Sequence, residues 1–328
     1  MPQSLPQSNP PKRRFRWPKG MPQLVALLLV LLVDSLVAPH FYQVILQDGR
    51  LFGSPIDILN RAAPVALLAI GMTLVIATGG IDLSVGSILA LSSALMASMI
   101  AKGTNPEMAI VFSAFIGILL GAINGIIISY GKVAPFIATL ATMTIYRGST
   151  LVFTNGNPIS GLSDDPIFTG FGQGFIMDIP VPAIIMLIAF FILWFVLKKT
   201  PLGRQTYAVG GNEKVFYISG IKIDRIKIFA YSLTGCLCAI AGAILTARLN
   251  SAQPTAGLGY ELDAIAAVVL GGTSLAGGKG RISGTLIGAL IIGTLNNGLN
   301  ILNVSSFYQQ VVKGVVILLA VLMDRKKN

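Results

Sequence analysis

Apolar stretches separated by short polar segments follow one another along almost the whole chain. The nine long stretches cover residues 22–38, 62–79, 83–101, 108–129, 133–153, 179–197, 228–248, 283–303 and 308–323. Most of them approach the roughly 20 residues that an α-helix needs to cross about 30 Å of hydrocarbon. The pattern therefore predicts an all-α integral membrane protein in which each long stretch is one transmembrane helix.

A tenth, shorter apolar stretch at about 263–272 is interrupted by glycine. Its sequence, AIAAVVLGGTSLAGG, reaches Gly271 and Gly272 too early for the helix to span a membrane alone. Nonhelical backbone at membrane depth is tolerated only where it is buried in protein or lines a wet cavity. We therefore predict about ten transmembrane helices, one of them broken, with both termini on the same side of the membrane.

The basic residues give these helices an orientation. The net charge is +11, although charged residues make up only 11% of the chain and the mean hydropathy is +0.77. With a cytoplasmic N-terminus, 18 of the 24 Lys and Arg residues fall in cytoplasmic segments, where basic residues of membrane proteins collect. The charge is therefore topological, and no nucleic-acid partner is expected. We predict a multi-pass membrane protein with both termini in the cytoplasm.

Two segments differ from this pattern in composition. Residues 1–21 are rich in Pro, Gln and Ser and then in basic side chains, which is typical of a disordered cytoplasmic tail. Residues 22–328 form one polytopic membrane domain. Within it, residues 198–227 make a polar segment that holds seven basic side chains.

The chain lacks residue patterns for catalysis or metal binding. His40 is its one histidine, and Cys236 and Cys238 point to different sides of a helix, which makes them packing residues. The segment TSLAGGKG, residues 273–280, resembles a phosphate-binding loop but has Thr at the first glycine position and Gly where a magnesium-binding Ser or Thr is needed. We predict a protein that is not an enzyme and binds no nucleotide, cofactor or metal.

Neutral polar side chains inside the apolar stretches are candidates for a solute pathway. Polar groups in a membrane tend to face a bundle interior or an aqueous path, and neutral amides and hydroxyls suit an uncharged, polyhydroxylated solute. The alternative is structural, because Ser and Thr bond their own backbone and Asn joins helices. With polar residues of the outer loops, the pathway candidates are Asn124, Gln253, Tyr260, Glu261, Asp263, Asn296 and Asn297.

Glycine pairs mark two predicted helix breaks. TGGIDLSVGSILA and AGGKGRISGTLIGA each place a glycine seven positions after the first glycine of a pair, at Gly86 and Gly284. The spacing is compatible with parallel internal repeats and also with close helix packing. The residues assigned to helix breaks are Gly79, Gly80, Asp82, Gly271, Gly272, Gly277 and Gly278.

Several motifs resemble the permease subunit of sugar importers of the ATP-binding cassette (ABC) superfamily, the ribose type above all. They are GMTLVIATGGIDLSVGSILAL, ATMTIYRG, LGRQTYAVGGNEKVFYISGIKI, SAQPTAGLGYELDAIAAVVLGGTSLAGGKGRISGTLIGALIIG and NNGLNIL. The similarity covers nearly the whole chain from residue 22. It implies the fold of the cobalamin importer (type II), in a homodimeric pore surrounded by membrane lipid.

The same resemblance implies partners and a substrate class. A cytoplasmic ATP-binding subunit would hold ATP and Mg, and a periplasmic or extracellular sugar-binding protein would deliver the solute. The expected solute is a monosaccharide, ribose first, although relatives carrying arabinose, xylose, allose, galactofuranose or autoinducer-2 share much of the pattern. The rival from another class is a self-sufficient secondary carrier or channel, and a proton-coupled carrier normally needs a membrane-embedded carboxylate or histidine relay.

The resemblance gives the polar segment 198–227 a role, because in such importers a cytoplasmic loop with short helices docks on the ATPase. A docking loop needs apolar anchors within a polar rim. We predict Gly220 as a joint between two short elements. The residues assigned to ATPase coupling are Gly210, Gly211, Asn212, Glu213, Val215, Phe216, Ile218, Gly220 and Ile221.

Two outer loops are the predicted contact surface for the sugar-binding protein. Residues 154–178 carry three aspartates and no basic residue, and residues 250–263 lead into the broken helix. We expect Gln253, Tyr260 and Glu261 to lie near the mouth of the pathway.

Overall fold

The computed structural model describes residues 20–37, 41–47, 50–218, 220 and 222–325. The predictions for the N-terminal tail up to residue 19, for His40 and for Ile221 fall outside the described residues.

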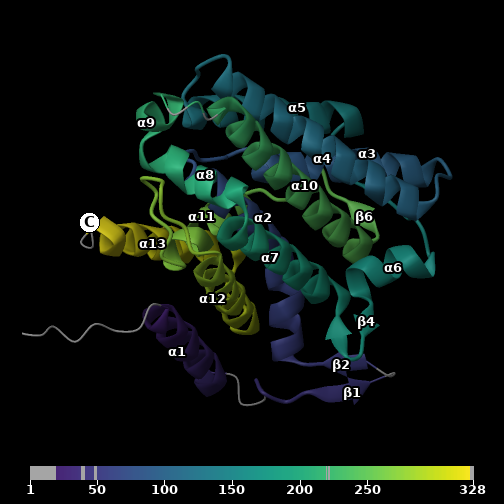
Figure 1. Cartoon of the computed structure of the whole chain (residues 1–328). Helices are drawn as coiled ribbons and strands as arrows, with labels where there is room; N and C mark the ends of the chain where they lie inside the picture. The colour runs from purple at the N-terminus through teal and green to yellow at the C-terminus, as the bar shows by residue number, and fades with distance from the viewer. Residues whose placement is uncertain (1–19, 38–40, 48–49, 219, 221, 326–328) are drawn as a thin grey trace, which may run out of the picture.

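Long α-helices dominate the described chain, so the all-α membrane fold is confirmed (Figure 1). They are α1 (Met21–Val37), α2 (Ser54–Ala77), α3 (Val85–Ala101), α4 (Pro106–Ser129), α5 (Pro135–Thr154), α7 (Val181–Lys199), α10 (Ile223–Leu249), α12 (Ile282–Ile301) and α13 (Ser306–Arg325). Six have the length and apolar composition to cross a membrane, and α1, α3 and residues 306–319 of α13 are shorter apolar helices. Helix α2 begins eight residues before the predicted stretch, because its first turns are polar.

Shorter elements lie between these helices. The helices are α6 (Pro166–Gln173), α8 (Pro201–Gly211), α9 (Glu213–Ile218) and α11 (Tyr260–Leu270). The strands are β1 (Ile45–Gln47), β2 (Arg50–Phe52), β3 (Ile159–Ser160), β4 (Phe175–Ile176), β5 (Ile179–Pro180) and β6 (Ser251–Ala252). They form three antiparallel pairs, β1 with β2, β3 with β6 and β4 with β5. All six strands were missed, because the hydropathy pattern does not detect strands of two or three residues.

Proline fixes where several helices begin. Pro55, Pro106, Pro135, Pro182 and Pro201 stand at the first or second helical position of α2, α4, α5, α7 and α8. Proline suits this position because its fixed φ is already helical and the N–H it lacks has no partner within the helix.

The three strand pairs gather at one end of the bundle, which we call the strand end, and α8 and α9 lie at the opposite end, which we call the α8–α9 end (Figure 1). Successive passes alternate in direction between these ends, and the shorter α11 returns the chain between α10 and α12. Among the described residues, the nine long helices and the shorter α11 make ten passes. The number agrees with the prediction, and the pass that contains α11 is the broken one.

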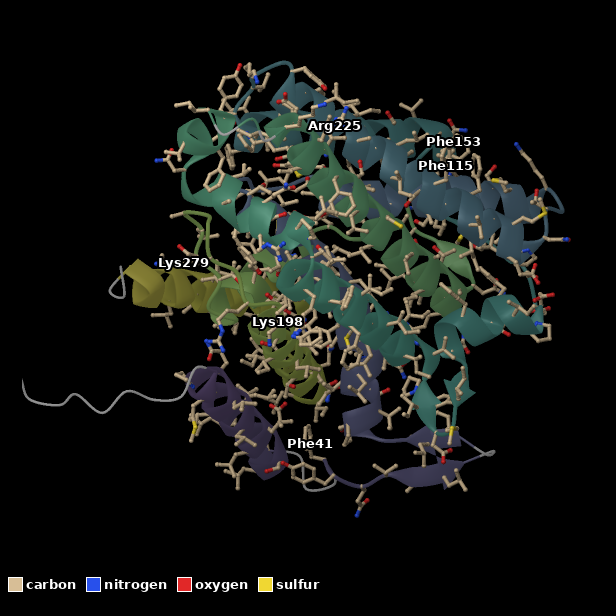
Figure 2. All side chains as sticks on the ribbon, in the orientation of Figure 1. Phe41, Phe115, Phe153, Lys198, Arg225 and Lys279 are labelled. Atoms are coloured by element: carbon tan, nitrogen blue, oxygen red, sulfur yellow. The ribbon has the colours of Figure 1, made fainter. Side chains whose placement is uncertain are left out.

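Helix α2 forms the centre of the bundle. Every residue from Ala62 to Ala77 is buried, and α10, α12, α11 and α7 surround it. The outer helices expose large apolar side chains instead, among them Phe115 of α4 and Phe153 of α5 (Figure 2). A membrane protein needs such an apolar exterior because the surrounding lipid offers no hydrogen-bond partners.

Small residues allow α4 and α10 to pack with their backbones in contact. Gly117, Gly121 and Gly125 recur every four residues on α4 and face α10. A Cβ on Gly121 would overlap the carbonyl oxygen of Tyr231, and one on Gly125 would lie 2.6 Å from the Cα of Ile228. The glycine spacing along α4 therefore permits close helix packing.

Candidate translocation site

The pass that contains α11, the eighth along the chain, is helical over only part of its length. After β6, residues 253–259 have no regular structure, and α11 then runs from Tyr260 to Leu270. The segment 253–259 contacts Arg147, which lies seven residues before the strand-end terminus of α5 and therefore about 10 Å inside it. Gly271 and Gly272, which we assigned to a helix break, follow the helix directly. The segment predicted as an outer loop is thus partly re-entrant.

Arg147 supplies hydrogen bonds to the re-entrant backbone. Its Nη1 donates to the carbonyl oxygens of Pro254 at 3.0 Å and Ala256 at 2.7 Å. Carbonyl groups without a helical partner need such a donor at membrane depth. Gly86 of α3 permits the close approach of this segment, because a Cβ there would overlap the Gly257 carbonyl oxygen.

An ion pair joins α11 to α13. Lys313 Nζ lies 2.8 Å from Asp263 Oδ2, and the Asp263 side chain is only 2% exposed. Sequence reasoning assigned Asp263 to the solute pathway, whereas its carboxylate is engaged within the protein. The partner Lys313 was missed, although a lysine within an apolar stretch is itself a signal that an acid lies nearby.

The surface around Arg147 is mixed, because exposed hydroxyl side chains stand there beside the exposed apolar side chains of Ile145 and Leu258. Thr144 and Ser149 of α5 and Thr255 of the re-entrant segment are exposed there. The positions of Gly148 and Gly259 have open space where a side chain would stand. What distinguishes this open face from the exposed surfaces of α1 and α7 is its hydroxyl groups, which make it the better candidate for contact with a polar solute.

The predicted pathway residues divide between this face and the bundle interior. Tyr260 and Glu261 are half-buried at the start of α11, and the Glu261 carboxylate accepts a hydrogen bond from the Gly259 N–H at 3.2 Å. Gln253 is half-buried at the start of the re-entrant segment and donates to Ser251 Oγ at 3.1 Å.

Asn124 acts as a joint between helices. Its Nδ2 donates to Ser84 Oγ at 2.7 Å, and Ser84 Oγ donates to Asp82 Oδ1 at 2.6 Å. All three residues are buried where α4 meets the connection from α2 to α3. This arrangement matches the structural alternative for intramembrane asparagine.

Asn296 and Asn297 lie on α12, away from the open face. Asn297 is buried, and the neighbouring Gly298 accommodates the buried carboxylate of Asp34 from α1. Asp34 was missed by sequence reasoning, although a single carboxylate within the first apolar stretch was a visible signal.

Five of the glycines predicted for coupling or for helix breaks meet in one cluster. We call it the glycine node and define it as Gly79, Gly210, Gly211, Gly277 and Gly278. The Gly278 N–H donates to the Ala77 carbonyl oxygen at 3.2 Å. A Cβ on Gly210 would overlap that same oxygen and lie 2.6 Å from the Gly278 nitrogen, whereas a Cβ on Gly211 would meet nothing within 4 Å. The end of α8 is therefore in backbone contact with the connections α2–α3 and α11–α12.

Backbone donors of the segment 273–280 are used internally. Besides the bond from Gly278, the Gly277 N–H donates to the Ser274 carbonyl oxygen at 3.2 Å. Thr273 Oγ1 accepts from the Arg281 N–H at 3.0 Å. The segment therefore closes a turn between two helices rather than opening a cradle for phosphate.

Helix α9 presents apolar side chains to the surroundings. Ile218 is 85% exposed, Tyr217 76% and Val215 52%, whereas Phe216 is half-buried. Tyr217 was not among the predicted anchors. Asn212 caps the helix, since its Oδ1 accepts from the Val215 N–H at 3.3 Å.

The joint predicted at Gly220 lies elsewhere than expected. Helices α8 and α9 meet at Asn212, and Gly220, with a φ of 75°, lies between α9 and α10. Glycine suits this turn because side chains disfavour positive φ. Glu213, which opens α9, pairs with Lys227 of α10 at 2.8 Å and closes the same connection.

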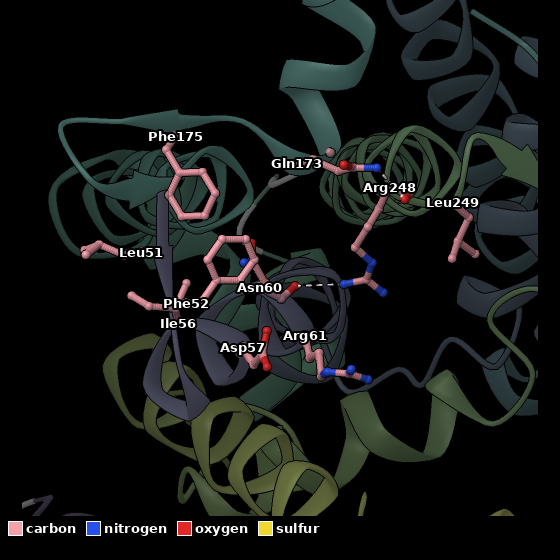
Figure 3. A pocket seen from close by; sticks show the side chains of 11 residues that line it. Leu51, Phe52, Ile56, Asp57, Asn60, Arg61, Gln173, Phe175, Arg248 and Leu249 are labelled. Carbon is pink, nitrogen blue, oxygen red and sulfur yellow. Dashed lines mark hydrogen bonds between the residues drawn. The ribbon is translucent and has the colours of Figure 1, made fainter. Parts of the chain in front are cut away.

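A pocket of about 400 Å³ opens at the strand end, and we call it the strand-end pocket (Figure 3). Arg61 of α2 and Arg248 of α10 point into it, and neither belongs to an ion pair among the described residues. Arg248 Nη1 donates to the Asn60 carbonyl oxygen at 3.2 Å. The remaining lining residues are Leu51, Phe52, Ile56, Asp57, Asn60, Gly172, Gln173, Phe175 and Leu249.

The predicted outer contact loop has an internal structure that limits what its acids do. Asp165 Oδ1 accepts hydrogen bonds from the N–H groups of Ile167 at 2.8 Å and Phe168 at 3.3 Å. It therefore caps α6. The strand-end pocket lies at the other end of α6 and was not predicted, because its two arginines come from helices far apart in sequence.

The ten passes and the open polar face define a polytopic membrane permease. The family model described as "Branched-chain amino acid transport system / permease component" matches residues 54–321, and the chain belongs to this family.

Named relatives agree with this assignment. The ribose import permease of Bacillus subtilis is 62% identical over 307 residues, which are 93% of this chain and 92% of that protein. The ribose import permease of Escherichia coli K12 is 52% identical over 95% of each chain. The galactofuranose transporter permease of the same bacterium is 50% identical over 100% of this chain and 96% of its own. The resemblance to a ribose-type ABC permease is confirmed.

One solved structure shares the fold. It is an inward-facing conformation of a metal-chelate-type ABC transporter, with a TM-score of 0.55 and 11% identity, covering 94% of this chain and 98% of that chain. The likeness confirms the predicted ABC permease fold.

We expect the Asp263–Lys313 ion pair to hold α13 on α11. Lys313→Met leaves a buried carboxylate without its partner and should destabilise the protein by about 3 kcal/mol or more, whereas adding Asp263→Asn should recover most of this loss. Thermal unfolding in detergent of both single variants and the double variant measures the coupling. A double variant whose loss equals the sum of the single losses would show that the pair contributes no coupling energy.

Proposed function

We propose that this chain is the transmembrane permease subunit of an ATP-driven ribose importer. The observation that carries the proposal is the 62% identity to a ribose import permease along 93% of the chain. The galactofuranose relative, at 50%, keeps another monosaccharide as the second candidate. A self-sufficient secondary carrier is disfavoured because the named relatives and the structural neighbour are transport-system permeases.

The chain acts as a conduit and makes no covalent change in its cargo. ATP and Mg are held by a separate cytoplasmic subunit, and a periplasmic or extracellular sugar-binding protein delivers ribose. Closure of the ATPase shifts the permease between inward and outward openings. The chain itself is not an enzyme, and none of the described residues forms a group of three or more His, Cys, Asp or Glu able to hold a metal ion.

Two copies of the chain place their open faces toward one pathway. Thr144, Ser149 and Thr255 offer hydroxyl groups there, each of which both donates and accepts hydrogen bonds. Ribose carries several hydroxyl groups and no charge, so such side chains match it better than fixed charges do. The apolar faces of α1 and α7 contact lipid.

The α8–α9 end faces the cytoplasm. The protein lies in the inner membrane, with both termini on the cytoplasmic side. The support is the distribution of basic residues, since Lys198, Lys199 and Arg204 belong to this end and cytoplasmic segments are enriched in Lys and Arg.

Helix α9 docks on the ATPase and the glycine node transmits its movement. Val215, Tyr217 and Ile218 supply apolar contact area at the surface of α9. Behind them, α8 touches the loop that ends α11, and α11 carries the backbone next to Arg147. A displacement of α8 therefore reaches the re-entrant segment through backbone contacts, with no flexible side chain between them.

Reconstitution tests the proposed function directly. Vesicles holding the permease, its ATPase subunit and the sugar-binding protein should take up labelled ribose only with ATP, and an excess of unlabelled galactofuranose should compete less well than unlabelled ribose. Uptake by the permease alone would contradict the importer, and stronger competition by galactofuranose would change the substrate while keeping the machinery.

Two neighbouring glycines provide a matched test of coupling. Gly210→Ala forces apart backbones that now touch, whereas Gly211→Ala adds the same methyl group into open space. We expect Gly210→Ala to reduce ribose uptake per ATP hydrolysed at least tenfold and Gly211→Ala to change it less than twofold. Equal ratios in the two variants would remove the glycine node from the coupling path.

The strand-end pocket receives an acidic side chain of the sugar-binding protein. Arg61 and Arg248 bring two guanidinium groups to it against one carboxylate, Asp57, so its net charge is positive. Arginine binds carboxylates through paired hydrogen bonds, and burial of the pair strengthens the contact. The proposed orientation exposes this end to the side on which such a protein arrives.

We expect Arg61→Gln to weaken binding of the sugar-binding protein about tenfold or more, since charge-assisted bonds contribute about 1.5–3 kcal/mol. Surface plasmon resonance on permease in nanodiscs measures the affinity, and raised salt should narrow the difference from the parent protein. Lys102→Gln, at the same end but outside the pocket, is the control. Equal affinity for the two variants would exclude the pocket as the contact.

A further inference from the structure

A second cavity of about 390 Å³ lies at the opposite end of the bundle, where the ends of α7, α8 and α12 meet. Its lining includes Trp194, Lys198, Tyr207 and Arg281, and we call it the basic cavity. Figure 2 shows Lys198 where α7 approaches α12. Neither the open face around Arg147 nor the strand-end pocket includes any of these residues, so the transport pathway does not account for them.

The basic cavity has the charge of an anion site. Lys198 and Arg281 line it, no acidic residue does, and neither cation belongs to an ion pair among the described residues. Lys198 Nζ lies 5.0 Å from the centre of the Trp194 ring, a cation–π contact that holds the ammonium group beside the cavity. A Cβ on Gly20 would lie 3.2 Å from Arg281 Nη2, which places the guanidinium by the start of α1.

The surroundings indicate that the anion belongs to an amphiphile. From the cavity, α7 continues toward the strand end with an exposed apolar surface made by Ile188, Phe191, Ile192 and Phe195, each more than half exposed. A tryptophan and a lysine at the end of such a helix mark the level of the lipid headgroups. A small soluble anion would contact the two cations alone and would leave the adjoining apolar surface of α7 uncovered.

The cavity also has fixed walls. Tyr207 of α8 donates from its OH to the Gly280 carbonyl oxygen at 3.2 Å and so ties α8 to the segment before α12. Burial raises the pKa of the Tyr207 phenol, which keeps it a neutral donor at physiological pH. A ligand between Lys198 and Arg281 therefore bridges α7 and α12 next to the helix that carries the glycine node.

We propose that the basic cavity binds the headgroup of an anionic phospholipid, such as phosphatidylglycerol, while the acyl chains lie along the exposed face of α7. Basic cavities between membrane helices on the cytoplasmic side are suited to acidic headgroups. This lipid site is inferred from the geometry of this chain alone, and the inference does not depend on which sugar is transported.

Trp194 provides the measurement, because the chain has only two tryptophans and Trp17→Phe leaves Trp194 as the single emitter. This variant is placed in nanodiscs of phosphatidylcholine that contain a small, equal fraction of brominated phosphatidylglycerol or brominated phosphatidylcholine. Bromine quenches tryptophan on contact. We expect the phosphatidylglycerol probe to associate at least fivefold more strongly, since each basic residue contributes about that factor.

Charge variants assign the preference to the cavity. Arg281→Gln should lower the ratio of the two association constants about fivefold and leave the Trp194 surroundings intact, and Lys198→Gln with Arg281→Gln should bring it to one. Lys199→Gln removes the adjacent charge, which lies outside the cavity, and should leave the ratio unchanged. Far-ultraviolet circular dichroism and gel filtration confirm that each variant is folded.

Three results would overturn the proposal. The first is equal quenching by the two probes in the parent protein, and the second is a preference that survives in the double glutamine variant. The third is displacement of the phosphatidylglycerol probe by millimolar glycerol 3-phosphate, which identifies a soluble phosphate site instead.

Discussion

Every backbone carbonyl and N–H at membrane depth needs a hydrogen-bond partner, and one pass of this protein meets that demand without a complete helix. Residues 253–259 leave the helical pattern, and Arg147 replaces the missing donors by reaching two of their carbonyl oxygens. Much of the remaining arrangement follows from this contact. Helix α5 must stay beside the segment, and α11 must begin deep in the bundle. The start of α3 must also lack a side chain at Gly86.

A second constraint is the amount of glycine in the bundle. Glycine removes the side chain that normally separates helices, so backbone meets backbone between α4 and α10 and again at the glycine node. Contacts of this kind are short and stiff. A packed backbone contact has few intermediate positions, so helices joined in this way would move together as rigid units.

Hydropathy predicted the number and approximate bounds of the passes, because burial in lipid selects long apolar stretches with little regard to tertiary contacts. It placed the start of α2 too late, since the first turns of that helix are polar and face the strand-end pocket. The glycine pairs assigned to helix breaks follow the ends of α2 and α11 and precede the start of α12. The sequence did not reveal that Gly210 and Gly277 touch, because contact between distant segments is set by the whole bundle.

Candidate site residues were harder to predict than the fold. Asn124 and Asp263 are polar and intramembrane, as a pathway residue would be, yet each is occupied by a neighbour within the chain. Arg147, Lys313 and Arg248 matter because of where their partners lie, and no local pattern contains that information. Composition narrowed the chemistry to uncharged solutes, but only the folded bundle separated joining residues from exposed ones.

The pass that contains α11 begins with a nonhelical segment, and an extended segment covers more distance than a helix with the same number of residues. Seven residues in a helix span about 10 Å, whereas seven extended residues reach about 24 Å. Because residues 253–259 form turns and not a helix, a change in the length of this segment would leave the hydrogen bonds of α11 intact. A continuous helix would have to break bonds for the same change. The nonhelical segment would therefore absorb a displacement of α11. A continuous helix would transmit the same displacement to the strand end.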